Sequence, residues 1–319
     1  MCTAISYKTK TFYFGRNLDL DYSYEEAVTI TPRKYCMKFR KEPDMECHHA
    51  MIGMAYVREA YPLYYDGMNE KGLCMAGLLF QGNAYYQSEK SGCYNIAPFE
   101  MIPWVLGQCN NTEEAVTLLK STNVVKAHYS KGLRSTPMHW MIADRDRTIV
   151  VEPRKKGIRI YEHPVGVLTN NPPFPIQLWN LSNYQNLSTS QPMNTFAKEL
   201  TLQVYSRGMG GIGLPGDASS VSRFVKAAFV KCNSKCDGSE NESVSQCFHI
   251  LGSVEQVRGC VKLSDGNYEY TVYSSCCNAE KGIYYYKTYD SSGVKGINMH
   301  EIDLEAQQLQ SYPIWTEKN

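Results

Sequence analysis

A cysteine at position 2 is the feature of this sequence that most constrains its fold and chemistry. Removal of Met1 would make Cys2 the amino-terminal residue, so that one residue would carry both a thiol nucleophile and a free α-amino group. An α-amino group has an ordinary pKa of about 7.7–8.0, and it can therefore accept the thiol proton near neutral pH. A reaction that uses such a residue requires no separate catalytic histidine.

Two short runs of β-branched and aromatic residues follow Cys2, and they predict a β-hairpin at the start of the chain. The runs are residues 3–7 and 11–14, and Lys8-Thr9-Lys10 between them is predicted to form a tight turn. In an antiparallel pair that turns at Thr9, Cys2 lies opposite Arg16. A guanidinium at this place would favour the thiolate form of the cysteine over the thiol.

Asp19 is expected just beyond the end of the second strand, where its carboxylate could accept hydrogen bonds from the new α-ammonium group of Cys2. The spacing therefore predicts a nucleophile, a base, a cation and an orienting carboxylate in one place. On these residues alone an alternative interpretation stays open. Cys2 would then be an ordinary second residue, Arg16 a surface charge at a strand end and Asp19 a turn residue.

The charge balance and the hydrophobic pattern argue against nucleic acid and membrane partners. The 319 residues contain 33 lysines and arginines against 32 aspartates and glutamates, a net charge of +1, which leaves no basic surface for nucleic acid or anionic lipid. The amino terminus begins directly with a strand pattern, and no run approaches the roughly 20 apolar residues of a membrane span. We expect a cytoplasmic protein without a membrane anchor.

The twelve cysteines are spread along the chain without the spacing of a disulfide framework, which favours a reducing compartment. Cys232 and Cys236 are four residues apart, but they lack the second cluster that a zinc site needs. The group Cys47-His48-His49 resembles metal ligands but lies in a charged stretch that favours a solvated loop, so we assign no metal. Neither an HExxH pattern nor a glycine-rich phosphate loop occurs, and no cofactor is expected.

The remaining pattern predicts antiparallel strands flanked by helices, an α+β fold in a single domain over residues 2–319. Asn111-Thr112-Glu113-Glu114 resembles a capping box and predicts a helix to about Ser121. A second helix is predicted from Ser219 or Ser220, with Arg223 in its first turn. Strands are predicted at residues 27–31, 51–57, 74–80, 139–143, 148–152, 165–169, 268–274 and 283–288.

With these elements placed, the chain resembles the choloylglycine hydrolase family, which includes bile salt hydrolases and penicillin V acylases. The resemblance extends nearly from end to end. Its motifs are Cys2-Thr3, Phe14-Gly15-Arg16-Asn17-Leu18-Asp19, Asn69-Glu70-Lys71-Gly72-Leu73, His139-Trp140, Gly166-Val167-Leu168-Thr169-Asn170-Asn171-Pro172, Gly210-Gly211-Ile212-Gly213-Leu214-Pro215-Gly216-Asp217, Ser222-Arg223-Phe224 and Lys281-Gly282-Ile283-Tyr284-Tyr285-Tyr286.

The resemblance implies a four-layer αββα sandwich of the N-terminal-nucleophile hydrolase type, assembled as a homotetramer. It also implies hydrolysis of the amide that joins a bile-acid acyl group to glycine or taurine, through an acyl-cysteine thioester and without a cofactor. The family's catalytic set matches Cys2 as nucleophile, Arg16 and Arg223 around the thiol, Asp19 as the group that orients the amine, and Asn170 as the oxyanion asparagine.

Asn170 and Arg223 also have simpler interpretations when each is taken alone. Asparagine before Asn-Pro is a common turn residue, and an arginine in the first turn of a helix is commonly a solvated charge. The sequence departs from the family at Leu79, where bile salt hydrolases commonly have asparagine and penicillin V acylases tyrosine. We expect the main-chain N–H of Leu79 to serve as the second oxyanion donor.

The resemblance also suggests which apolar loop residues would face a steroid. They are Leu18, Val57, Tyr65, Tyr129, Leu133 and Met138, although an apolar residue of a loop can equally pack against the sheet. Three functions are compatible with the sequence: a conjugated bile salt hydrolase, a penicillin V acylase or other N-acyl amide hydrolase, and a binder of amphipathic steroids without turnover. The complete catalytic set argues against the binder.

Overall fold

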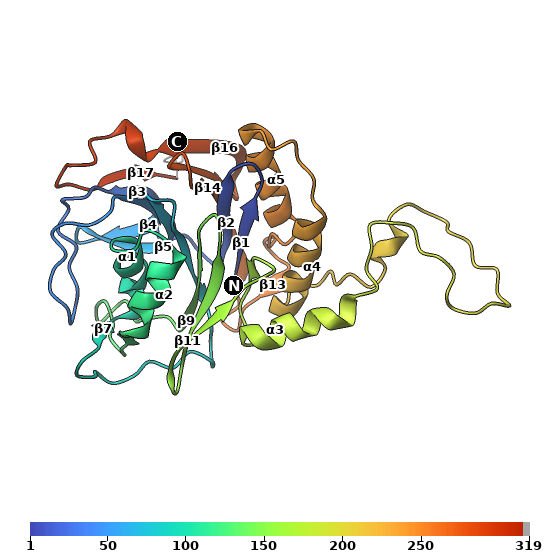
Figure 1. Ribbon diagram of the computed structural model, residues 1–319, viewed down its shortest axis with the longest axis horizontal. Coiled ribbons are helices and arrows are strands. Elements are labelled where there is room, and N and C mark those ends of the chain that lie inside the picture. Colours follow the sequence, from blue (N-terminus) through green and yellow to red (C-terminus); the bar gives the residue numbers. More distant parts are fainter. Residues whose placement is uncertain (315–319) are drawn as a thin grey trace.

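The computed structural model describes residues 1–314 and has the predicted α+β architecture of four layers. Two large β-sheets pack face to face, and helices cover the outer face of each sheet (Figure 1). Within residues 1–314 one sheet has seven strands and the other has eight. The αββα sandwich expected from the sequence is therefore confirmed.

The first sheet, called sheet A, contains the amino-terminal hairpin at its centre. Its strand order is β12-β1-β2-β14-β15-β16, and β13 pairs with the first two residues of β14. The strands are β1 (Cys2–Lys8), β2 (Phe12–Leu20), β12 (Val167–Leu168), β13 (Val261–Lys262), β14 (Tyr268–Asn278), β15 (Ile283–Thr288) and β16 (Ser291–Asn298). Residue 2 thus begins a strand that has a neighbouring strand on each side.

The second sheet, called sheet B, has the order β11-β10-β9-β6-β5-β4-β3-β17. Its strands are β3 (Ala27–Thr31), β4 (Met51–Arg58), β5 (Tyr61–Asn69), β6 (Cys74–Leu79), β9 (Met138–Ala143), β10 (Thr148–Arg154), β11 (Gly157–Glu162) and β17 (Gln310–Pro313). The short strands β7 (Tyr94–Ile96) and β8 (Thr122–Val124) form a separate parallel pair. Asn69 to Gly72 forms the predicted turn between β5 and β6.

The helices divide between the two outer faces. Helices α1 (Met101–Leu106) and α2 (Thr112–Lys120) lie on the sheet B side, whereas α4 (Ser220–Asn233) and α5 (Glu240–Gly252) lie on the sheet A side (Figure 1). Helix α3 (Phe174–Asn180) precedes α4 in the chain. Short 3-10 turns complete the set: η1 (Pro98–Glu100), η2 (Leu181–Tyr184), η3 (Met209–Gly211) and η4 (Met299–Glu301).

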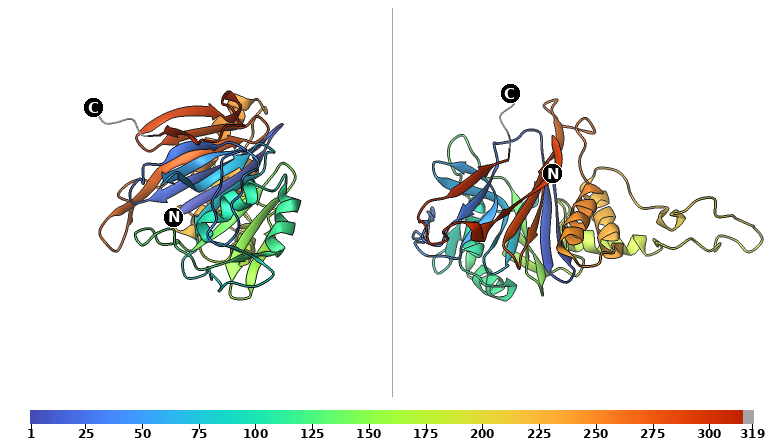
Figure 2. Two further views of the ribbon diagram at one scale, coloured as in Figure 1. Left: turned by 90° about the vertical axis from the view of Figure 1, so that its left-hand side faces the viewer. Right: turned by 90° about the horizontal axis from the view of Figure 1, so that it is seen from above.

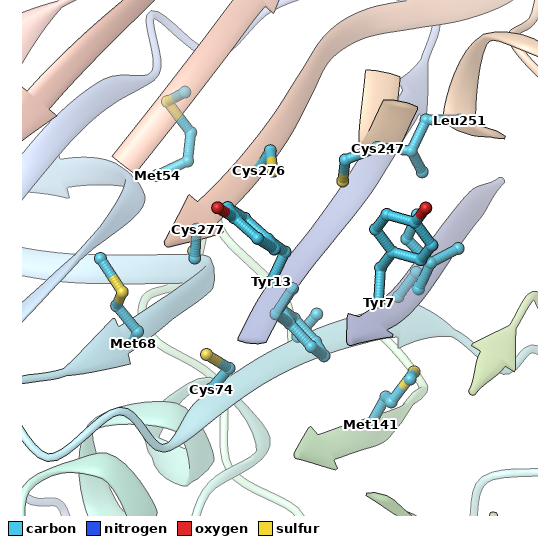
Figure 3. Close-up of a cluster of buried hydrophobic side chains, with 14 of the residues drawn as sticks. Tyr7, Tyr13, Met54, Met68, Cys74, Met141, Cys247, Leu251, Cys276 and Cys277 are labelled. Carbon is cyan, nitrogen blue, oxygen red and sulfur yellow. The ribbon is translucent and has the colours of Figure 1, made fainter. Parts of the chain in front are cut away.

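The core between and beside the sheets is rich in sulfur and aromatic side chains (Figure 3). Tyr13, Cys74, Cys276 and Cys277 are fully buried there. Burial raises the pKa of the Cys276 and Cys277 thiols well above the ordinary value, which keeps them protonated and unreactive. All twelve cysteines lie within the described residues, and each is a free thiol.

The predicted starts of α2 and α4 are confirmed, and each of these helices begins after a side-chain cap. The Asn111 side chain accepts a hydrogen bond from the Glu114 N–H at 2.9 Å, and Ser219 does the same for Ser222 at 3.4 Å. The reciprocal half of the capping box differs from the prediction, because Glu114 accepts from the N–H of Asn110 and not from that of Asn111.

The strand predictions are right in kind and less accurate in length. The predicted strands 27–31 and 283–288 have the bounds of β3 and β15. The strand predicted at 268–274 continues to Asn278, and the one predicted at 165–169 is reduced to Val167–Leu168. Helices α1, α3 and α5 and strands β5, β11, β16 and β17 were not predicted.

A long arm, residues 185–215, extends from the body between α3 and α4 (Figure 2). Its large apolar side chains include Met193, Phe196 and Tyr205, which are 85%, 79% and 81% exposed. The arm thus presents to solvent a kind of surface that folded chains usually bury.

None of the helices within residues 1–314 has the length and apolar character that a membrane span would require. The described residues also contain no group of three or more His, Cys, Asp or Glu side chains arranged to hold a metal ion. In the Cys47-His48-His49 group, the two ring nitrogens of His48 contact the carbonyl oxygens of His49 and Tyr35 at 2.7 and 2.8 Å.

Candidate active site

Cys2 begins β1 and is 4% exposed, with its thiol directed at the guanidinium of Arg16. The predicted register was wrong by two residues. Cys2 pairs with Leu18, and Ala4 pairs with Arg16, because the turn is centred on Lys10 and not on Thr9. A shift of two residues keeps every side chain on the same face of the sheet, so Arg16 still reaches Cys2 diagonally, with Nη2 2.7 Å from Sγ.

Arg16 is fully buried and anchored on two elements of sheet B. Its Nη1 donates to the carbonyl oxygens of Tyr65 in β5 and Gly77 in β6, both at 2.9 Å. Burial disfavours the charged form of Arg16, but attraction to the negative charges that Cys2, Tyr273 and Asp66 carry when ionised outweighs it and raises the pKa of Arg16 above its ordinary value. The cation is therefore permanent, and its position is fixed before any substrate binds.

Asn170 follows β12 and contacts three parts of the site. Its Oδ1 accepts hydrogen bonds from the Cys2 main-chain N–H at 3.0 Å and from Arg223 at 2.7 Å. Its Nδ2 donates to the carbonyl oxygen of Leu79 at 2.8 Å. An amide nitrogen has two hydrogens, so one N–H of Asn170 can still donate to a group bound beside Cys2.

The main-chain N–H of Leu79 is directed away from strand β9. Phe80 donates its N–H to Pro137 O at 2.8 Å. In an antiparallel pair, hydrogen-bonded residue pairs alternate with pairs that are not hydrogen-bonded, so Leu79 opposite Met138 belongs to the second kind. The Leu79 N–H and C=O consequently point to the side on which Asn170 lies.

Arg223, in the first turn of α4, is buried beside the Cys2 backbone and is not the solvated charge of the simpler interpretation. Its Nη1 donates to Cys2 O and Thr3 Oγ1, each at 2.7 Å, and its Nη2 donates to Asn170 Oδ1. Burial lowers the pKa of Arg223, whereas Asp19 and Cys2 favour its charged form. This arginine connects the Cys2 backbone with the Asn170 side chain.

Asp19 lies inside β2, which ends at Leu20, and not beyond the strand end as predicted. Its Oδ1 accepts from Thr271 Oγ1 at 2.7 Å, and its Oδ2 lies 3.9 Å from Arg223 Nη1. Within residues 1–314 this buried Oδ2 has no hydrogen-bond partner. A carboxylate oxygen with free acceptor capacity is thus present near the start of β1.

Met1 extends the β1–β2 ladder by one residue and lines the pocket at Cys2. Its α-ammonium forms an ion pair with Glu269 and donates to the main-chain oxygen of Asp19 at 2.8 Å, while the Asp19 N–H donates to Met1 O at 3.0 Å. With Met1 in place, the Cys2 nitrogen is a peptide N–H and has no lone pair available to accept a proton.

The Cys2 thiol opens into a pocket with aromatic and aliphatic walls. Five of the six predicted substrate-facing residues line it, namely Leu18, Tyr65, Tyr129, Leu133 and Met138. Val57 does not, because successive side chains of a strand face opposite sides and its neighbour Tyr56 takes the pocket side of β4. Further lining residues include Tyr24, Leu63, Leu79, Phe99, Arg134, Ser135 and Thr136.

Several residues of the site were missed by the sequence analysis. Thr271, which holds Asp19, lies 252 positions away in the chain, and Glu269 lies 268 positions from Met1. No local pattern marks such partners. Thr3 could have been found, since it adjoins Cys2 in the motif. Leu18, Tyr65 and Met138 were expected in loops but lie in strands β2, β5 and β9.

A cysteine at the start of a central strand in an αββα sandwich defines the class of N-terminal-nucleophile hydrolases. The chain belongs to the linear amide C–N hydrolases of the choloylglycine hydrolase family, which matches residues 2–312. It is 53% identical over 317 residues to the bile salt hydrolase/transferase of Lactiplantibacillus plantarum, a match that covers 99% of this chain and 98% of that protein.

More distant proteins show the same architecture. The bile salt hydrolase/transferase of Clostridium perfringens is 34% identical over 317 residues, with 98% of this chain and 96% of that protein covered. The crystal structure of a C2A mutant of conjugated bile acid hydrolase from the same species matches with a TM-score of 0.91 at 34% identity. The match covers 98% of this chain and 96% of that one. Penicillin V acylase from Agrobacterium tumefaciens shares the fold, with a TM-score of 0.77 at 18% identity. That match covers 97% of this chain and 90% of the acylase chain.

Proposed function

We propose that this enzyme hydrolyses the amide bond of glycine- or taurine-conjugated bile salts, with Cys2 as nucleophile after Met1 has been removed. The observation that carries the proposal is the Arg16 guanidinium held 2.7 Å from the Cys2 thiol. A fixed cation at this distance stabilises a thiolate, and Asn170 lies within 3.0 Å of the nitrogen that would become the α-amino group.

The proposed first half-reaction forms a thioester. The α-amino group of Cys2 takes the thiol proton, and the thiolate sulfur attacks the amide carbon of the substrate. Asn170 Nδ2 and the Leu79 N–H donate to the oxygen that becomes negative in the tetrahedral intermediate. Cys2 then returns the proton to the departing amine, and Asp19 Oδ2, which has free acceptor capacity, orients the ammonium form of Cys2.

The second half-reaction releases the bile acid. A water molecule gives a proton to the Cys2 amino group and attacks the thioester carbon. The same two donors stabilise the second tetrahedral intermediate, which collapses to a free carboxylic acid and the Cys2 thiol. Every proton and leaving group is accounted for by Cys2 and water, so the proposed cycle includes no cofactor.

The pocket favours an amphipathic anion as substrate. Its walls are mainly apolar, and Arg134 brings an exposed cation to the lining. The names of the similar proteins, bile salt hydrolase/transferase and conjugated bile acid hydrolase, agree with this class of compound. A steroid with an acidic conjugate would combine both features, with its rings on the aromatic walls.

One assay panel tests the proposal. Purified protein is assayed with glycocholate, taurocholate and penicillin V, and Cys2→Ala serves as the control. We expect release of glycine and taurine by the wild type and none by the control. Preferential cleavage of penicillin V would favour an acylase instead, and binding of the bile salts without any release would favour a steroid binder.

Removal of Met1 is a separate part of the proposal and is tested by mass. We expect the intact mass of the active protein to correspond to a chain that begins with Cys2. A preparation that retained Met1 completely and was fully active would contradict the proposed role of the α-amino group.

We also propose that the protein is a cytoplasmic homotetramer whose chains each fold as a single domain. The exposed apolar side chains of the arm support assembly, and the free thiols agree with a reducing compartment. Thiol titration of the denatured protein should then detect all twelve cysteines, and unfolding should occur in one cooperative transition. Several disulfides under non-reducing conditions would contradict the compartment.

A further inference from the structure

The segment that carries Asn170 is held by buried side chains that take no direct part in the proposed reaction. His139 in β9 is fully buried, and its Nε2 lies 2.9 Å from the carbonyl oxygen of Thr169. A carbonyl oxygen can only accept, so Nε2 carries a hydrogen and donates it. This bond fixes the backbone one residue before Asn170.

The same histidine also contacts the other side of the oxyanion site. Its ring stacks on Phe80, with the ring centres 4.2 Å apart and the planes inclined by 6°. Phe80 directly follows Leu79, whose carbonyl oxygen accepts from Asn170 and whose N–H points to the same side. One imidazole therefore lies between the two chain segments that supply the proposed oxyanion donors.

Gln177 in α3 holds the segment from the other direction. It is fully buried, and its Nε2 donates to the main-chain oxygens of Asn170 and Pro172 at 2.7 and 2.8 Å. Its Oε1 accepts from Thr169 Oγ1 at 2.8 Å. The backbone oxygens of residues 169, 170 and 172 thus each accept from a buried side chain.

Glu152 in β10 completes this support. Its Oε1 accepts from the Phe174 N–H at 2.7 Å and lies 4.0 Å from His139 Nδ1. Both side chains are fully buried. Within residues 1–314, His139 Nδ1 and Glu152 Oε2 have no hydrogen-bond partner. The hydrogen bonds that these side chains do make all hold the loop of residues 169–174, and burying polar groups is costly unless such bonds compensate.

We propose that His139 and Gln177 are positioning residues for the oxyanion site, acting through Asn170 and Leu79 and not on the thiol. An oxyanion donor is effective only within about 2.7–3.1 Å of the developing charge. A displacement of about 1 Å can reduce the rate about 10²-fold. The inference rests on the proposed hydrolysis and names two residues that set its rate without contacting substrate.

The test uses two variants of His139 that separate its contacts. His139→Phe keeps an aromatic ring beside Phe80 and removes the donor to Thr169, whereas His139→Gln keeps a donor at the place of Nε2. For glycocholate hydrolysis we expect kcat to fall about 10–100-fold in His139→Phe, with KM within about threefold, and to recover at least partly in His139→Gln.

Alkylation of Cys2 by iodoacetamide separates positioning from general damage. The reaction uses the thiolate and needs no oxyanion donor, so its rate in His139→Phe should stay within about twofold of wild type. Gln177→Met, which leaves His139 in place, should show the same pattern of reduced kcat and normal alkylation. A structural collapse would slow both reactions together, and that result would overturn the proposal.

A double variant provides the decisive control. If His139 acts through Asn170 and Leu79, then adding His139→Phe to Asn170→Ala should reduce kcat by clearly less than His139→Phe does alone, because only the effect through Leu79 is left, whereas independent effects would multiply. Multiplying effects, or an unchanged kcat in both His139→Phe and Gln177→Met, would overturn the inference while leaving hydrolysis intact. Absence of turnover in the wild type would instead refute the proposed function.

Discussion

At the scale of single residues, one side chain connects the parts of the proposed reaction. Asn170 accepts from the Cys2 nitrogen and from Arg223, and it donates to Leu79. Arg223 in turn holds Cys2 O. The proposed nucleophile, the proposed oxyanion donor and one of the two buried cations are thereby fixed relative to one another, so a substrate would find its charged partners already oriented.

Asn170→Ala should reduce kcat for glycocholate and taurocholate by about 10²–10³, the usual effect of losing one oxyanion donor. Leu79→Asn is the matched control on the other side of the site. It should change kcat little, because the proposed donor at position 79 is the main-chain N–H, and any effect should appear in the ratio of glycine to taurine conjugates. A rise of two orders of magnitude in kcat on both substrates would show that an asparagine side chain is required there.

Arg16→Lys should lower kcat/KM by at least about 10²-fold although the charge is kept. The guanidinium donates hydrogen bonds to Tyr65 O, Gly77 O and Cys2 Sγ. A lysine ammonium group cannot reproduce that planar arrangement of donors. Alkylation of Cys2 by iodoacetamide should slow as well, in contrast to the His139 variants. An alkylation rate equal to wild type would show that Arg16 does not activate the thiol.

The residues of the site were predictable to different degrees. Cys2, Arg16 and Asp19 lie on one hairpin, where an error of two residues in register does not change which face a side chain takes. Arg223 and Asn170 approach Cys2 only through the tertiary fold, so the family motifs and not the local pattern identified them. The local pattern does not reveal the partners of Thr271 and His139, because these partners lie far away in the chain: Asp19 in β2 for Thr271 and the carbonyl oxygen of Thr169, just after β12, for His139.

Among the secondary-structure elements, the starts of α2 and α4 and the turn at Asn69 to Gly72 were predicted accurately, whereas the turn of the first hairpin was misplaced by one residue. Caps are local, since a side chain satisfies an N–H two or three residues later. Helix α5 was not predicted, although the Ser239 side chain before it accepts a hydrogen bond from the Glu242 N–H. Strand β16 was not predicted because its residues are almost entirely exposed. Its polar and glycine-rich sequence carries no hydrophobic alternation, and pairing with β15 alone defines it.

Asn111→Ala should lower the free energy of unfolding by about 1 kcal/mol through loss of the α2 cap. Helix α2 lies on the outer face of sheet B, and its residues do not line the pocket at Cys2. The kinetic constants for bile salts should therefore stay at the wild-type values. Chemical denaturation and the assay panel measure the two effects, and a lowered kcat without lowered stability would contradict this separation.

Glu100 in η1 should make stability depend on pH in an unusual direction. Burial raises the pKa of its carboxyl to about 7, although the N–H groups of Ala97 and Arg40 donate to it. Between pH values of about 4.5 and about 7, the folded chain keeps a proton on Glu100 that the unfolded chain has released. This group's contribution to stability therefore falls as the pH rises through that window, by up to roughly 3 kcal/mol at about 1.4 kcal/mol per unit.

Glu100→Gln removes the titrating group and should flatten this dependence. The measurement is the free energy of unfolding of both proteins at several pH values from about 4.5 to about 8, compared as a difference so that other titrating groups cancel. Parallel pH profiles for the variant and the wild type would show that Glu100 does not take up the proton.

Across the molecule, the two sheets supply the residues of the candidate active site, whereas the arm does not. Sheet A supplies Cys2, Arg16 and Asp19, and sheet B supplies Leu79 and the carbonyl anchors of Arg16, so the site depends on how the sheets pack. The arm contributes no residue to the lining of the pocket. Its exposed apolar side chains therefore need another explanation, for which assembly is the proposed one.

Replacing Phe196 and Tyr205 together by serine should shift the protein from the proposed tetramer to smaller species. Both side chains are about four-fifths exposed in the single chain, and burial of a large aromatic side chain typically contributes about 1.5–3 kcal/mol. Because every copy of the chain in a symmetric assembly would lose both aromatic side chains, the loss of interface stability is repeated at each interface. Light scattering at micromolar concentration measures the oligomeric state of both proteins.

Serine in place of Ile176 and Trp179, exposed residues of α3 outside the arm, provides the matched control and should leave the tetramer intact. A wild-type monomer would refute the assembly itself, and an unaltered tetramer in the arm variant would assign the interface to another surface.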